Sequence, residues 1–142
     1  MGYMSSKDEE DPAMEGIMVR LTTPFAQAVA QVRTALQGQG FGVLTEIDVK
    51  QTLHEKIGAE LEDYLILGAC NPSLAHRALQ ADPRIGLLLP CNVTVRSQDG
   101  GTVVEAVDPQ VLVAFTGDPE LKPIAAEAAR RLRAALADIS SI

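Results

Sequence analysis

The sequence predicts a single α+β domain in which one mixed sheet of about five strands carries helices mainly on one face. Apolar runs of strand length alternate with segments whose apolar residues recur every three or four positions. Each helical segment has a single apolar stripe, and the clearest hairpin has one apolar and one polar face, so each element has one side to bury. A parallel sheet with a helix on each side is the alternative that the same alternation allows.

Composition and charge set the domain boundaries. The chain has 142 residues, of which 46% are hydrophobic and 22% charged, as in a soluble protein with an adequate core. Residues 1–16 hold five acidic side chains against one lysine, a net charge of −4 out of −7 for the whole chain. We expect residues 1–16 to be a disordered acidic tail or an expression remnant, and residues 17–142 to form the folded domain.

Several classes of protein are disfavoured. No apolar run approaches the roughly 18 residues of a membrane span, and the acidic start lacks the features of a signal peptide, so we expect a cytoplasmic protein that does not bind membranes. The arginines near the C-terminus lie on the polar face of a helical segment, and no basic stripe is interleaved with aromatic residues, so no nucleic-acid partner is expected. No glycine run fits a nucleotide fingerprint, and no cofactor is expected.

The first half of the chain alternates strands and helices. The expected strands are residues 17–22, 41–47 and 65–67. Each is followed by a helix with a small polar residue at its N-cap: Thr23, Asp48 and Asn71. The three helices end at Gly38 or Gly40, at Gly58 and at Asp82-Pro83.

A hairpin and two helices complete the domain. Asp99-Gly100 is a strong two-residue turn signal. The predicted register pairs Val95 with Val104, Val93 with Ala106 and Thr94 with Glu105, and it places Arg96 diagonal to Glu105. Asp108-Pro109 and Asp118-Pro119 then start a short helix and a long one, and the long helix runs to about Ile139.

The candidate site lies in residues 64–96, where both cysteines precede an asparagine. Cys70 ends a strand directly before a helix N-terminus, where unpaired N–H groups favour an anion or a thiolate. We expect the two Cys-Asn pairs to come close together, with His76 and Arg77 at the rim. The ligand-binding candidates are therefore Cys70, Asn71, His76, Arg77, Cys91 and Asn92. The alternative is that Asn71 only caps its helix and Arg77 only solvates a helix face.

The chemistry of these residues is left open by the sequence. Twenty residues separate Cys70 from Cys91, a spacing that fits no familiar zinc pattern, and neither His54 nor His76 completes one, so no metal site is expected. In a chain without a secretory signal the two cysteines are expected to be reduced. They are either small buried hydrophobic residues or functional thiols.

Four segments of the chain resemble a known family. They are Gly40–Lys50, Ile66–Pro72, Ala75–Leu79 and Gly86–Val93, and they are similar to the family called domain of unknown function 302. The resemblance runs from about Ile17 to the C-terminus. It implies a small bacterial or archaeal α+β domain with an outline like the TATA-binding-protein fold, a possible homodimer, and no established activity. The shared pattern includes all six candidate residues, together with Pro72 and Pro90.

Two functional hypotheses follow from these observations. The first is a small ligand-binding or interaction module that forms a dimer and holds a small molecule or an anion, since no catalytic constellation is present. The second is a thiol-based enzyme or redox sensor centred on Cys70. Whether the chain is an enzyme stays undecided from the sequence.

Overall fold

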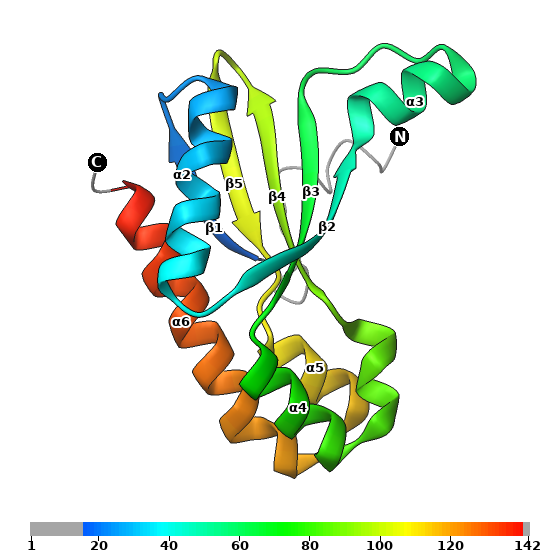
Figure 1. Cartoon of the computed structure of the whole chain (residues 1–142), viewed down its shortest axis with the longest axis vertical. Coiled ribbons are helices and arrows are strands. Elements are labelled where there is room, and N and C mark those ends of the chain that lie inside the picture. Colours follow the sequence, from blue (N-terminus) through cyan, green and yellow to red (C-terminus); the bar gives the residue numbers. More distant parts are fainter. Residues whose placement is uncertain (1–15, 141–142) are drawn as a thin grey trace, which may run out of the picture.

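The computed structural model describes residues 16–140 and contains one five-stranded sheet in the order β1-β5-β4-β3-β2 (Figure 1). The strands are β1 (Ile17–Leu21), β2 (Gly42–Asp48), β3 (Tyr64–Cys70), β4 (Cys91–Gln98) and β5 (Gly101–Ala106). The predicted α+β class and single sheet are confirmed. The pairing differs from the expected mixed sheet, because every neighbouring pair of strands is antiparallel. The tail prediction for residues 1–16 lies, except for Gly16, outside the described residues.

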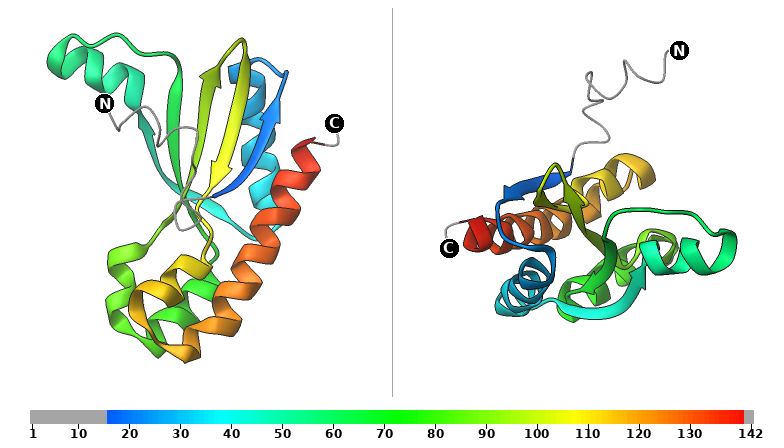
Figure 2. Two further views of the ribbon diagram at one scale, coloured as in Figure 1. Left: turned by 180° about the vertical axis from the view of Figure 1, so that it is seen from behind. Right: turned by 90° about the horizontal axis from the view of Figure 1, so that it is seen from above.

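Helices cover one face of the sheet and extend beyond its two ends (Figures 1 and 2). They are α2 (Phe25–Gly38), α3 (Val49–Ile57), α4 (Pro72–Ala81), α5 (Gln110–Thr116) and α6 (Lys122–Ser140), with 3-10 turns η2 (Pro83–Leu88) and η3 (Pro119–Leu121). Because α3 and α4 lie beyond the strand ends instead of crossing back over the sheet, β3 pairs antiparallel with β2, and β4 pairs antiparallel with β3. This excludes the parallel alternative. No helix within residues 16–140 has the length and apolarity needed to cross a membrane.

The main core lies between the sheet and the helices α2 and α6. Val32 and Leu36 of α2 and Leu132 of α6 are fully buried, and they belong to one cluster with Leu67 and Val93 of the central strands. Burying each such side chain contributes about 1.5–3 kcal/mol. The apolar stripes that predict α2 and α6 are therefore the surfaces that hold these helices on the sheet.

A second, smaller core forms a helical lobe at one end of the sheet. Leu74 and Ala78 of α4 pack there with Ile85 of η2, Leu121 of η3 and Ile124 of α6. Since α6 has 19 residues, it is about 28 Å long and reaches from this lobe across the sheet. The candidate site lies where the two cores meet.

Side-chain caps form at the starts of α3 and α4, whereas one predicted cap, at the start of α2, is wrong. Asp48 accepts a hydrogen bond from the Gln51 N–H at 2.9 Å, as its position predicts. Thr23 is not an N-cap, because Pro24 occupies that position and no side chain caps α2. The Thr23 carbonyl instead accepts a hydrogen bond from the buried Thr102 hydroxyl at 2.7 Å, which ties the start of α2 to strand β5.

The hairpin between β4 and β5 has the predicted register. Asp99 and Gly100 have φ values of 51° and 81°, as the central residues of a type I′ turn require. The cross-strand partners are Val93 and Ala106, Thr94 and Glu105, and Val95 and Val104. Arg96 reaches its diagonal neighbour Glu105 at 3.3 Å.

Candidate functional site

The two cysteines lie on neighbouring strands at the end of the sheet that meets the helical lobe. Cys70 is the last residue of β3 and Cys91 is the first of β4, where it pairs with Ala69. Both are free thiols, and both line a cavity of about 40 Å³. The cavity wall is otherwise almost entirely apolar, with contributions from Phe41, Leu74, Ala78, Leu89, Ile124 and Ala128.

Gly68 fixes the position at which β4 begins. A Cβ atom at Gly68 would lie 2.7 Å from Cγ of Pro90 and closer still to Oγ1 of Thr45. Real Cβ atoms do not approach other atoms so closely, so Pro90 can pack on β3 only because residue 68 has no side chain. This close packing delivers Cys91 to the cavity opposite Ala69.

Burial makes Cys91 a poor nucleophile. Its side chain is on the core side of the sheet, and the residue is 8% exposed. Desolvation, with a smaller contribution from the nearby Cys70, raises the pKa of the Cys91 thiol to about 11. Cys91 therefore keeps its proton at neutral pH, whereas Cys70 is half-buried and more accessible.

A polar cleft of about 580 Å³ borders the apolar cavity. Asn71 and Leu74 at the start of α4 line both spaces. The polar cleft is completed by Gly40, Pro72, Ser73, Arg77, Pro123, Glu127 and Arg131. An apolar pocket and a set of polar groups thus meet at Asn71.

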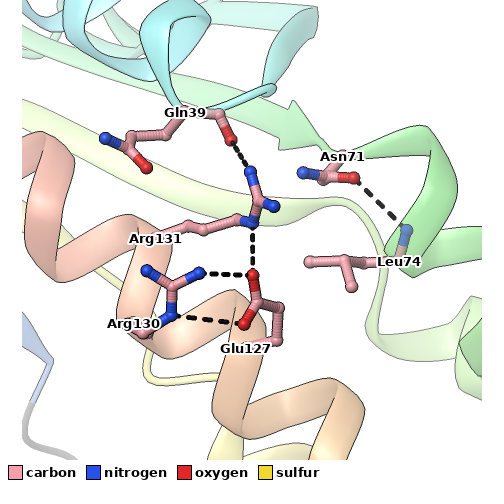
Figure 3. Close-up of polar contacts among 6 residues, drawn as sticks. All are labelled: Gln39, Asn71, Leu74, Glu127, Arg130 and Arg131. Carbon is pink, nitrogen blue, oxygen red and sulfur yellow. Dashed lines mark hydrogen bonds and ion pairs between the residues drawn. The ribbon is translucent and has the colours of Figure 1, made fainter.

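The oxygen and the nitrogen of the Asn71 side-chain amide have different roles. Its Oδ1 caps α4 by accepting a hydrogen bond from the Leu74 N–H at 3.3 Å. Its Nδ2 lies 3.0 Å from the point that a Cβ of Gly40 would occupy, so glycine at residue 40, with φ of 83°, leaves room for it. In Figure 3 the Asn71 amide nitrogen lies on the side of Arg131, away from the capping bond. Nδ2 is therefore a donor available to the cleft.

Arg131 is held across the cleft by two fixed acceptors (Figure 3). It donates to Oε2 of Glu127 at 2.7 Å and to the backbone carbonyl of Gln39 at 3.2 Å. Arg130 also pairs with Glu127, at 2.6 Å. Hydrogen bonds from Arg130 and then Arg131 lower the pKa of the Glu127 carboxyl, so it is ionised at neutral pH. Arg77 has no ion-pair or hydrogen-bond partner among residues 16–140.

The structure brings only part of the predicted site together. Cys70, Asn71 and Cys91 line the apolar cavity, and Arg77 lines the adjacent cleft. His76 and Asn92 are exposed and line neither space.

Sequence reasoning missed Arg131, which it assigned with the neighbouring arginines to a solvated helix face, and it did not consider Glu127. Their spacing of four residues signals a helical ion pair. The link from Arg131 to Gln39 spans 92 positions of sequence, so only the fold reveals it. No group of three or more potential metal ligands is found in the described part of the chain.

The fold and the cleft define a small α+β domain with an apolar cavity beside a polar opening. Residues 17–139 match the model of the family described as domain of unknown function DUF302, and the chain belongs to that family. It is also similar to a solved structure, that of an uncharacterized conserved DUF302 protein from Bacillus stearothermophilus, with a TM-score of 0.82 and 34% identity. The alignment covers 88% of this chain and 98% of the other. No curated protein matches the chain.

Proposed function

We propose that the protein is a binding module for a small ligand that carries an anionic group next to a short apolar segment. The observation that carries this proposal is the meeting, at Asn71, of an apolar cavity and a cleft with available donors. Ligand sites typically combine such an apolar wall with a few well-placed polar groups.

The anionic group would bind in the polar cleft. Asn71 Nδ2, the Ser73 hydroxyl and the Arg77 guanidinium are donors there, and the start of the ten-residue helix α4 adds partial positive charge. Glu127 opposes an anion, but Arg130 and Arg131 neutralise it. The balance of charge in the cleft therefore favours a singly charged anion over a cation.

The apolar segment would enter the cavity beside the cysteines. A cavity of about 40 Å³ has room for about three water-sized groups, since each needs roughly 10–15 Å³. A short alkyl chain of about this length fits it, whereas a longer chain does not. Each methylene that leaves water contributes about 0.8 kcal/mol.

A series of carboxylates tests this proposal. We expect the thermal stabilisation of the protein to increase from acetate to propionate to butyrate and then to stop increasing at hexanoate, because the cavity is full. Inorganic phosphate serves as an anion without an apolar segment, and we expect it to stabilise the protein less than butyrate. Equal shifts for all carboxylates would contradict the role of the cavity, and no shift at any concentration would contradict binding.

Asn71→Asp separates ligand binding from helix capping. Aspartate keeps the oxygen that caps α4, but it replaces the Nδ2 donor with an acceptor. We expect the variant to unfold at a temperature close to that of the parent and to lose the response to butyrate. Asn71→Ala removes both functions, and its expected destabilisation is about 0.5–2 kcal/mol. A full butyrate response in Asn71→Asp would show that Nδ2 has no part in binding.

A thiol-based function is the second candidate, favoured by the fact that Cys70 and Cys91 line the same cavity. Two such thiols can be oxidised to a disulfide by oxidised glutathione, which takes up two electrons and two protons and leaves as two molecules of reduced glutathione. Free thiols also fit the cytoplasmic location that the sequence predicts. Mass spectrometry after incubation with oxidised glutathione tests this candidate: a loss of two hydrogens supports it, and two unmodified thiols contradict it.

A further inference from the structure

The helix α3 is amphipathic but has no buried residue. We call residues 48–63, which comprise the end of β2, α3 and the connection to β3, the arm. Its apolar residues include Ile57 and Leu61, which are 75% and 41% exposed. Figures 1 and 2 show α3 projecting from one corner of the sheet, away from α2 and α6.

The arm is held in shape by polar contacts within itself. Asp48 caps α3, Gly58 ends it in a left-handed conformation, and Lys50 pairs with Asp63 at 3.5 Å. A helix of nine residues is too short to be stable in water on its own, and in proteins such helices depend on burial of their apolar face. The arm therefore has a defined shape and an apolar side that the rest of residues 16–140 covers only in part, since Val49 and Leu53 are half-buried but Ile57 is exposed.

The sheet has an open face on the side opposite α2 and α6. The strand registers place two rows of outward residues on it: Ile47, Ile66, Thr94, Glu105 and Met18 in one, and Tyr64, Arg96, Val103 and Arg20 in the other. Met18 and Ile47, on the two edge strands, are 37% and 48% exposed, whereas Val103 near the middle of this face is only 3% exposed. No helix within the described residues covers this face (Figure 2).

The arm and the open face are complementary in charge. Residues 48–63 contain five acidic residues and two lysines, a net charge of −3 with histidine neutral. On the open face Arg96 and Glu105 pair with each other, which leaves Arg20 as a cation without a partner in the described part of the chain. Opposite charges flanking apolar residues on both surfaces favour contact between them.

We propose that these two surfaces bind each other in a symmetric homodimer, in which the arm of each copy lies on the open face of the other. A two-fold axis makes both contacts at once, because each copy has one arm and one open face. The open face, with five strands at about 4.8 Å spacing and six residues at about 3.3 Å each, has a flat area of roughly 400 Å². The outline of α3 covers roughly 140 Å² of the partner's open face. Each copy contributes its own arm and the patch of open face under the partner's arm, a flat outline of roughly 280 Å². The interface is therefore smaller than the roughly 800 Å² per partner of a standard one, and the dimer is expected to form only as the concentration rises.

Sedimentation velocity of the full chain tests the proposal. We expect the mass of the sedimenting parent protein to rise with concentration towards twice the chain mass of 15.1 kDa. Ile57→Lys is expected to weaken dimerisation roughly tenfold or more, because an apolar side chain is replaced by a charge at the interface. Arg20→Glu is expected to weaken it as well, because it places negative charge opposite the acidic arm. Leu87→Lys is the matched control: Leu87 is 83% exposed but lies in the helical lobe, and its variant should stay dimeric.

Both test residues are exposed in the monomer, so circular dichroism should show that all variants remain folded. A monomeric parent protein at every concentration would overturn the proposal. A dimer that Leu87→Lys disrupts and Ile57→Lys does not would place the interface in the helical lobe and also overturn it. A dimer weakened by Ile57→Lys but unaffected by Arg20→Glu would show that the arm binds some surface other than the open face.

Discussion

The buried thiol of Cys91 makes the stability of the protein depend on alkaline pH. In the folded state its pKa is about 11, against an ordinary value of 9.0 that applies to the unfolded chain. The unfolded chain therefore loses this proton as the pH passes about 9, while the folded protein keeps it until about 11. Raising the pH through this window drives unfolding.

The size of the effect follows from the pKa difference. Each pKa unit corresponds to about 1.4 kcal/mol, so a difference of about two units lowers the free energy of unfolding by about 3 kcal/mol. Cys91→Ala removes the titrating group. Below about pH 9 the variant should be less stable than the parent, because it loses buried contacts, and above about pH 10 this disadvantage should shrink or reverse.

Urea denaturation of the two proteins under reducing conditions measures this effect. The free energy of unfolding is determined at intervals from about pH 8 to about pH 11, and the variant's value is subtracted from the parent's at each pH. The subtraction cancels the lysines and tyrosines, which titrate in the same range in both proteins. A difference that does not change with pH would refute the reasoning and show that the Cys91 thiol reaches solvent.

Two further predictions concern the structure around the site. Gly68→Ala should lower the free energy of unfolding, measured by urea denaturation, by about 1–3 kcal/mol, because its Cβ would collide with Thr45 and Pro90. Thr45→Ala in the same background removes one of the colliding groups and should recover part of this loss. Stability unchanged in Gly68→Ala would show that β3 and Pro90 are less closely packed than described. Asp82→Asn should destabilise the protein at neutral pH, because the Asp82 carboxylate accepts bonds from the Arg84 side chain and N–H, which lower its pKa. That stabilisation is present above the unfolded pKa of about 3.9 and is lost as the pH falls through the lowered pKa. The melting temperatures of parent and variant should therefore converge in acid. A difference in melting temperature that stays constant with pH would contradict the prediction.

Local patterns predict the elements well because their causes are local. The apolar stripes of α2 and α6 and the Asp99-Gly100 turn lie within a few residues of the structures they specify. The relative direction of the strands cannot be predicted in this way, because it depends on whether α3 and α4 cross back over the sheet or extend beyond it. Apolar periodicity is the same in both cases, so the sequence alone leaves the parallel alternative open.

In the candidate site too, the residues placed by local patterns could be predicted and those placed by the fold could not. Cys70 and Asn71 could be placed from the end of an apolar run and the cap that follows it, and both border the cavity. His76 was included through its distance along the helix, yet it is exposed and lines neither the cavity nor the cleft, because the buried side of α4 is formed by Leu74 and Ala78. Arg131 could not be found, since its role depends on the packing of α6 beside Gln39.

The side-chain amide of Asn71 offers the most direct test of the proposed binding function. In ¹⁵N-edited NMR spectra its Nδ2 signal can be assigned by comparison with Asn71→Asp and followed while butyrate is added. The proposal predicts a saturable shift of this signal, accompanied by shifts of the backbone amides of Ser73 and Leu74 at the start of α4. Saturable shifts confined to other parts of the protein, or none at all, would contradict it.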